Sequence, residues 1–310
     1  MTTAIPDKTG KMATAHVMDT RASVQTIKSK LRDYYTLTKP EVNLLILMTT
    51  SAGYYLASRG PFHIAGMVNT LVGTLLVASG TATLNQWYER RWDGQMLRTA
   101  SRPLPAGRLS AREAFWFGML LSVAGGIYLA VAVNGLAALL AVSTLLSYLL
   151  IYTPLKRKTP LCTMLGAIPG AMPTLIGWAG ASGAIDRNAW FLFAVLFLWQ
   201  FPHFLAIALM YRDDYARAGY RMLPHFDLDS RFTRAEILGF TIVLILMTLL
   251  PLAGHVGPVY LSVVSLASVY LLYHVGKLMK STSKVLASRV VHASVLYLPV
   301  VLVMMIVCKA

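Results

Sequence analysis

The segment NQWYERRWD at 85–93 carries an amide and two carboxylates spaced four residues apart: Asn85, Glu89 and Asp93. If the segment is helical, this spacing places the three side chains on one face, within roughly 80° of one another. Such a column of oxygen ligands suits Mg²⁺ and leaves room for water and phosphate oxygens. Arg98 and Arg102 follow shortly after, and their guanidinium groups could hold a phosphate directly. The segment therefore predicts a site for Mg²⁺ and a phosphate.

A second interpretation of the same residues stays open. Arg90 and Arg91 lie beside the carboxylates, so the segment could be a solvated helix end with i,i+4 salt bridges. Acidic groups next to a long apolar stretch are costly, however, and this favours the functional interpretation.

A second acidic cluster, Asp213 and Asp214, follows another apolar stretch and is preceded by Arg212. Adjacent carboxylates repel each other unless a cation lies between them. An ordinary charged loop would also explain this cluster. Two acidic clusters on one membrane face, with apolar helices behind them, nevertheless suit a diphosphate whose hydrocarbon tail lies in the lipid.

Lys156 and Arg157 follow a further apolar stretch. A basic run beside a membrane segment typically anchors its topology. Near a diphosphate, the same residues could also neutralise the leaving group.

His203 lies within an apolar segment, directly after Pro202 and about 15 Å deeper than Asp213 if the helix is straight. A lone histidine inside a membrane is often a hydrogen-bonded packing residue, but a role as a ligand or in proton transfer is also open. Pro202 predicts a kink that frees backbone groups toward a cavity.

The elements that position these residues are predicted to be membrane helices. Of the 310 residues, 56% are hydrophobic and 13% are charged, against about 25% charged in a typical soluble protein. A helix needs about 20 apolar residues to cross the hydrocarbon. Asn134-Gly135 and the segment 251–258 divide the two longest uncharged stretches. We therefore predict an all-α membrane protein with about nine transmembrane helices, from the uncharged stretches 42–58, 60–88, 114–155, 159–185, 188–211, 237–276 and 290–308.

The basic residues predict the orientation of these helices. The formal net charge is +15, and with the N-terminus inside, all 28 Lys and Arg residues except Arg59, Arg187 and Lys309 fall in the inner segments. This is the positive-inside pattern, which predicts a cytoplasmic N-terminus. The expected partners of the basic charge are anionic membrane lipids and an anionic substrate, and nucleic acid binding is not expected.

Residues 1–33 are polar and of mixed charge, without the apolar run of a cleaved signal peptide. We expect a disordered cytoplasmic tail at 1–33 and a transmembrane domain at 34–310. A mitochondrial presequence fits less well, because such presequences are rich in Arg and avoid acids. The inner (plasma) membrane of a bacterium is therefore preferred over the mitochondrial inner membrane.

The motifs resemble those of a known family. The column at 85–93, followed by RTASRPLPAGR at 98–108, resembles the UbiA-type intramembrane prenyltransferases. Within these, the chain is similar to the protohaem IX farnesyltransferases, or haem O synthases. The strings that carry this finer resemblance are YTPLKRKTP at 152–160, GAMP at 170–173, WQFPHF at 199–204 and DDYARAGYRMLP at 213–224.

The chain departs from the superfamily pattern at two positions. Glu89 stands where Asp is usual, and this keeps the charge. Arg217 stands four residues after Asp213, where the superfamily often has another Asp.

The resemblance implies an enzyme that transfers the farnesyl group of farnesyl diphosphate to a vinyl group of haem b, giving haem O for respiratory oxidases. Mg²⁺ is the implied cofactor, haem b is a substrate, and a downstream haem A synthase is an implied partner. Farnesyl transfer with these residues would proceed by departure of a metal-neutralised diphosphate, attack of the vinyl carbon on the allylic cation and capture of the resulting cation by water.

The resemblance also implies roles for the residues above. The catalytic residues are expected to be Asn85, Glu89, Asp93, Asp213 and Asp214. The first four of these are the expected Mg²⁺ ligands. Residues expected to hold the diphosphate are Arg98, Arg102, Lys156, Arg157 and Arg212, and His203 is the expected haem contact.

Two other functions remain as alternatives. A prenyltransferase acting on an aromatic quinone precursor would share the fold and the first motif. A transporter is a less favoured alternative, because it would place ionisable residues through the membrane midplane, whereas here the charged residues gather at the inner edge.

Overall fold

Long apolar stretches form helices in this chain because a helix satisfies its own backbone hydrogen bonds where lipid offers no partner. The computed structural model describes residues 26–250 and 257–309, and every regular element within them is helical. Eight helical segments are long and apolar enough to cross a membrane. The prediction of an all-helical membrane protein is therefore confirmed. The eight are α3 (Ile64–Asp93), α4 (Ala111–Ala132), the segment Gly135–Leu155, α7 (Cys162–Ser182), α8 (Arg187–Met210), α11 (Arg231–Leu249), α12 (Pro258–Lys280) and α13 (Lys284–Val307).

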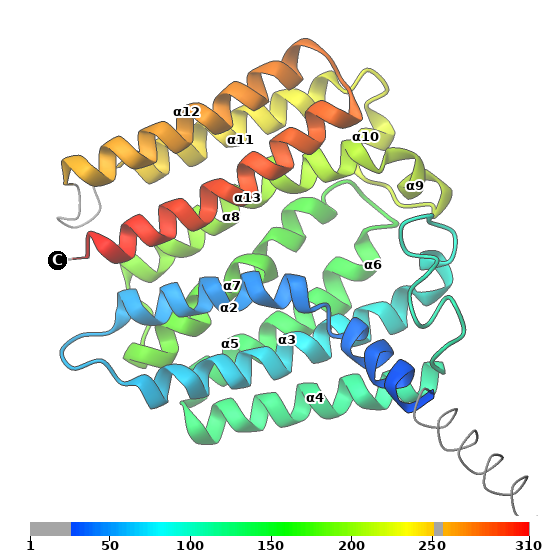
Figure 1. Ribbon diagram of the computed structural model, residues 1–310, viewed down its shortest axis with the longest axis horizontal. Helices are drawn as coiled ribbons and strands as arrows, with labels where there is room; N and C mark the ends of the chain where they lie inside the picture. The colour runs from blue at the N-terminus through cyan, green and yellow to red at the C-terminus, as the bar shows by residue number, and fades with distance from the viewer. Residues whose placement is uncertain (1–25, 251–256, 310) are drawn as a thin grey trace, which may run out of the picture.

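The helix α2 (Pro40–Ala57) lies in the same bundle and raises the count of long helices in the described residues to nine (Figure 1). It is not among the eight candidate spans, and its Asn43 is buried, donating to Thr38 O and Ser79 Oγ at 2.9 Å each. Most of the interruption predicted at 251–258 lies outside the described residues.

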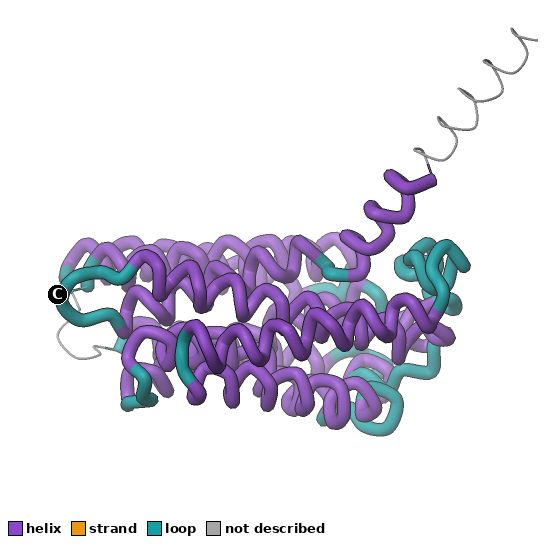
Figure 2. Tube along the Cα trace, turned by 90° about the horizontal axis from the view of Figure 1, so that it is seen from below, coloured by secondary structure: helices purple, strands orange, loops and turns teal. Residues whose placement is uncertain are grey.

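The helices run alongside one another, and their connections gather at two opposite ends (Figures 1 and 2). One end holds the chain's C-terminus. The other holds the loop 94–110, the short helices α9 (Arg212–Arg217) and α10 (Leu223–Phe226), and a helix of residues 26–37 that leans away from the bundle. Both acidic clusters therefore lie at this second end.

The N-terminal segment differs from the expectation at one point. Residues 26–33, which we expected to belong to a disordered tail, are part of the helix 26–37. Residues 1–25 lie outside the described residues.

Glycines allow α2 to approach α7 closely. Gly53 of α2 lies against the backbone of Thr174, and Gly177 of α7 lies against the backbone of Thr50. A Cβ atom at either glycine would overlap the carbonyl oxygen opposite, so a larger residue would force the helices apart. Small residues in this role are typical of membrane helix interfaces, and this one fixes the position of α2 beside the site.

The segment Gly135–Leu155 changes geometry as it nears the site. It consists of α5 (Gly135–Leu146), a π-helical turn η1 (Ser147–Tyr152) and α6 (Thr153–Leu155). Pro154 lacks the N–H group that a regular helix would use at that position. Turns of π-helix widen a helix and are frequent at functional sites, and only α6 separates this one from Lys156.

Candidate active site

The predicted oxygen column forms on the last turns of α3. Asn85, Glu89 and Asp93 are nearly fully buried, with exposed fractions of 1%, 5% and 1%. Buried carboxylates are tolerated only when each finds a partner. The contacts that compensate these groups come from other parts of the chain.

Each member of the column contacts its own cation, supplied by a different segment. The three contacts are Lys39 Nζ to Asn85 Oδ1 at 3.1 Å, Lys156 Nζ to Glu89 Oε1 at 2.9 Å, and Arg102 Nη1 to Asp93 Oδ2 at 2.7 Å. The structure thus brings the predicted Arg102 and Lys156 to the column and adds Lys39, which the sequence analysis did not identify.

The alternative of a solvated helix end with local salt bridges is wrong. Among the described residues, neither Arg90 nor Arg91 forms an ion pair with the column. Arg90 instead donates to the Trp87 carbonyl and lies over the Trp87 ring, 5.1 Å from its centroid. The charges of the column are instead compensated by cations that contact it in space but come from other segments of the chain.

The column has a free oxygen of the kind a metal ion would use. Asp93 Oδ1 is buried and has no hydrogen-bond partner, although its other oxygen pairs with Arg102. Within the described residues, no three His, Cys, Asp or Glu side chains are grouped closely enough to hold a metal ion. Mg²⁺ commonly keeps water and substrate phosphate oxygens beside one or two carboxylates. Glu89 and Asp93, with Asn85, fit that pattern.

Tyrosine rings surround the Lys156 ammonium group. The Nζ atom lies 4.4 Å from the ring centroid of Tyr152 and 5.9 Å from that of Tyr148, both in the π-helical turn. Burial alone would lower the pKa of Lys156, but the Glu89 carboxylate and these rings outweigh it, so that the pKa lies well above its usual range. Lys156 is therefore a permanent positive charge.

Tyr220 is a second neighbour of Glu89, beside Lys156. Its hydroxyl lies near the Glu89 carboxylate, and the residue is 3% exposed. Burial and the neighbouring carboxylate raise the pKa of Tyr220 above its usual range. The hydroxyl therefore stays protonated and can donate to an oxygen anion.

Lys39 lies directly before Pro40, the first residue of α2, and takes a left-handed backbone conformation with φ of 51°. Its side chain reaches Asn85 across the entry to α2. Burial, and then the nearby Arg102, lower the pKa of Lys39 to about 7. The only sequence signal was a lysine between a polar segment and a membrane helix.

The second acidic cluster divides into two roles. Asp214 is 8% exposed, accepts from the backbone N–H groups of Leu97 and Arg98 at 3.4 Å each, and pairs with Arg217. Asp214 therefore links α9 to the loop 94–110 through hydrogen bonds. Asp213 is exposed, and its carboxylate has no ion-pair or hydrogen-bond partner among the described residues. The cation that relieves repulsion between the two acids is Arg217, at the position where the superfamily often has Asp.

The remaining predicted cations form no hydrogen bond or ion pair with the column among the described residues. Arg98 lies over the ring of Tyr211 at 4.8 Å, and Arg157 lies over that of Trp92 at 4.5 Å. Arg212 donates to the Leu228 carbonyl at 3.1 Å. These three guanidinium groups are placed by aromatic and backbone contacts, and among the described residues no ion pair holds them.

His203 lies between α8 and α13. Its Nδ1 is 2.9 Å from Ser294 Oγ, and its ring stacks on Trp199 with centroids 4.7 Å apart. Trp199 Nε1 donates to the Ser294 carbonyl at 2.7 Å. One nitrogen is thus used in packing, while Nε2 has no partner in the described residues.

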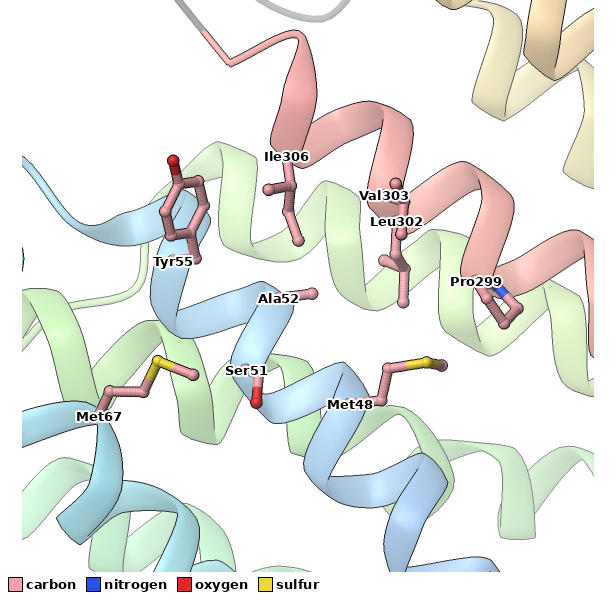
Figure 3. Close-up of a pocket in the computed structure, with 9 residues that line it drawn as sticks. All are labelled: Met48, Ser51, Ala52, Tyr55, Met67, Pro299, Leu302, Val303 and Ile306. Carbon is pink, nitrogen blue, oxygen red and sulfur yellow. The ribbon is translucent and has the colours of Figure 1, made fainter. Parts of the chain in front are cut away.

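An apolar pocket of about 330 Å³ opens between α2, α3 and α13 (Figure 3). Side chains of α2 and α13 face each other across it. Along α2, Met48 lies nine residues beyond Lys39, a distance of about 14 Å on a helix. The pocket is lined by Met48, Ser51, Ala52, Tyr55, Met67, Pro299, Leu302, Val303 and Ile306.

Comparison with known proteins places this geometry among prenyltransferases. The profile of the UbiA prenyltransferase family matches residues 46–297. A protein of Solibacter usitatus named Protoheme IX farnesyltransferase is 48% identical over 281 residues, covering 87% of this chain and 96% of the relative. A protein of Koribacter versatilis with the same name is 42% identical over 290 residues, covering 90% and 94%.

Solved structures share the fold at lower identity. The structure of a digeranylgeranylglyceryl phosphate synthase superposes with a TM-score of 0.73 at 20% identity, covering 91% of this chain and 99% of that one. A UbiA homologue from Archaeoglobus fulgidus bound to GPP and Mg²⁺ gives a TM-score of 0.62 at 15% identity, covering 88% and 99%.

Proposed function

The chain belongs to the UbiA prenyltransferase family, and from this premise we propose that it transfers the farnesyl group of farnesyl diphosphate to a vinyl group of haem b, forming haem O. Relatives named Protoheme IX farnesyltransferase cover nearly the whole chain. They favour haem over an aromatic quinone precursor as the acceptor.

One observation carries the proposal: the buried column in which every oxygen-bearing side chain is matched by a cation. A diphosphate bound by divalent metal needs oxygen ligands for the metal and positive charge for the phosphate oxygens. Both are present along α3, because Asn85, Glu89 and Asp93 supply the oxygens while Lys39, Lys156 and Arg102 supply the charge.

We assign the metal to Asn85, Glu89 and Asp93. Asp213, which the resemblance adds as a fourth ligand, is not grouped with these carboxylates among the described residues. A UbiA homologue from Archaeoglobus fulgidus with the same fold has been solved with Mg²⁺ and DMAPP, and with Mg²⁺ and GPP. Bound Mg²⁺ would neutralise the diphosphate and make it a better leaving group. Asp214 acts differently, by holding the backbone of Leu97 and Arg98 in place.

The leaving group is bound by the chain's own donors. Lys156 keeps its positive charge, and the Tyr220 hydroxyl beside it donates to a phosphate oxygen. Arg102 supplies positive charge beside Asp93. Lys39, with a pKa of about 7, gains its charge when a bound anion favours the protonated form. Arg98, Arg157 and Arg212 form the outer rim, where the diphosphate arrives from the cytoplasm and leaves.

The allylic cation that remains needs a site without bulk water. The farnesyl tail extends from the column along α2 toward the apolar pocket, which begins about 14 Å away at Met48. The vinyl carbon of haem then attacks, and a water molecule captures the resulting cation as a hydroxyl group.

His203 is our proposed contact for haem. Its Nδ1 is held by Ser294 and its ring is fixed against Trp199, so Nε2 is presented in one orientation. A histidine fixed through one nitrogen is suited to bind iron or a propionate through the other.

The chain is a multi-pass membrane protein. We place it in the plasma membrane of a bacterium, in keeping with the bacterial relatives. Its product would pass to a haem A synthase or directly to an oxidase.

Mass spectrometry of haems extracted from membranes tests the proposal. The chain is expressed in a host that lacks its own haem farnesylation. Membranes with the wild-type chain should contain haem O, and membranes with Asp93→Asn should contain haem b alone. Asp229→Asn is the control, because Asp229 is an exposed acid at the same end of the bundle, 3.9 Å from Arg231. Only haem b in wild-type membranes, with prenylated aromatic acid instead, would refute the haem assignment.

A further inference from the structure

The helix of residues 26–37 presents an apolar stripe that the protein does not cover. Ile27, Leu31 and Tyr35 recur every fourth residue, which places them on one face. Their exposed fractions are 59%, 63% and 63%. The neighbouring face of the same helix is in contact with the bundle.

The bound face holds the helix firmly against the rest of the chain. Leu37 is fully buried, and Asp33 accepts from Arg108 Nε at 2.9 and 3.1 Å. Lys30 pairs with Glu113 at the start of α4, at 2.6 Å. The apolar stripe therefore has a fixed direction and is not free to turn inward.

The charge of the helix is divided between these faces. Its one acid, Asp33, is buried against Arg108, so the exposed charge is positive. Lys28 and Arg32 lie beside the stripe, exposed and without an ion-pair partner among the described residues. An apolar stripe flanked by basic residues is typical of a helix in the headgroup region of a membrane.

The helix also lies where the membrane surface must be. Only Thr38 and Lys39 separate it from α2, and in both views it leans outward from the end of the bundle (Figures 1 and 2). Twelve helical residues extend about 18 Å, so the stripe cannot move far from the membrane boundary.

We propose that residues 26–37 form an interfacial helix that inserts Ile27, Leu31 and Tyr35 into the cytoplasmic leaflet, with Lys28 and Arg32 on anionic headgroups. A second copy of the chain fits the stripe less well, because it would bring the same positive charges together. The consequence reaches the candidate site. Arg108 also donates to the Ser101 carbonyl at 3.1 Å, directly before Arg102, so the leaflet would support the loop that holds Asp93.

The depth of the helix can be measured without any assay of activity. Cys162 and Cys308 are replaced by alanine, and an environment-sensitive fluorophore is attached to a cysteine at Leu31 or, as the matched control, at Arg32. The protein is placed in vesicles of phosphatidylcholine with or without phosphatidylglycerol. The probe at 31 should shift to the blue and be quenched by a lipid spin-labelled near its headgroup. The probe at 32 points about 100° away and should be quenched by aqueous iodide.

Three comparisons decide the outcome. Quenching of both probes by iodide alone would overturn the proposal. A blue shift at 31 that appears only at high protein density would also overturn it, because that result means contact between copies. The combined variant Lys28→Gln/Arg32→Gln should reduce the shift gained from phosphatidylglycerol. If phosphatidylglycerol increased the blue shift of this variant as much as that of the parent protein, Lys28 and Arg32 would not bind anionic headgroups.

Discussion

Removing the Lys156 ammonium group should lower both the stability of the protein and its turnover. Removing Glu89 as well should restore the stability and leave the turnover abolished. Lys156 Nζ and Glu89 Oε1 are 2.9 Å apart, and their side chains are only 13% and 6% exposed. Breaking a buried ion pair from one side typically costs about 3–5 kcal/mol, because the remaining charge is left without a partner. Lys39 also lies near Glu89 and offsets part of this loss. We therefore expect Lys156→Met to lower the free energy of unfolding by about 3 kcal/mol.

The double variant Lys156→Met/Glu89→Gln removes both charges together. Replacing a buried ion pair by neutral groups is often nearly neutral for stability, so most of the lost free energy should return. Farnesyl transfer should stay abolished in both variants, because the charge that binds metal and diphosphate is missing.

The assay is reversible unfolding in mixed detergent micelles, measured beside turnover on the same preparation. Lys158→Met is the matched control, since Lys158 is an exposed lysine in the same loop. It should unfold and turn over like the wild type. Lys156→Met with wild-type stability and turnover would show that the pair with Glu89 does not hold the site. A double variant no more stable than Lys156→Met would refute the uncompensated charge as the cause.

Three further outcomes are expected. Thorough chelation of divalent cations should abolish wild-type turnover, and turnover that survives it would exclude the metal assignment. His203→Ala should impair haem binding, measured by absorbance, while affinity for a farnesyl diphosphate analogue stays unchanged; equal loss of both would mark His203 as a packing residue. A single cysteine at Ile185 should react with an impermeant thiol reagent from outside, whereas one at Ala100 should not. Equal labelling of the two positions would refute the assignment of the cytoplasmic face.

Several features could be predicted because they depend on residues close together in the chain. Membrane spans follow from local hydropathy, and the Asn85, Glu89 and Asp93 column follows from the helical repeat alone. The described residues contain nine long helices, of which eight are apolar enough to cross a membrane, and they contain the column at the end of α3. The predicted tail at 1–33 was less accurate, since residues 26–33 are helical. Their helix is held by Arg108 and Glu113, which lie far along the chain.

Only the tertiary structure decided which cation meets which oxygen. Lys39 and Asn85 are 46 positions apart, and Lys156 and Glu89 are 67 positions apart. The same limit applies to Asp214, whose carboxylate caps backbone groups 117 and 116 positions away. Its neighbour Asp213 stays exposed. Composition and periodicity report the environment of one segment at a time, whereas these pairings arise from helix packing, through contacts such as those of Gly53 and Gly177. The sequence by itself therefore determined the oxygen-bearing side chains of the column and their spacing, and packing determined their partners.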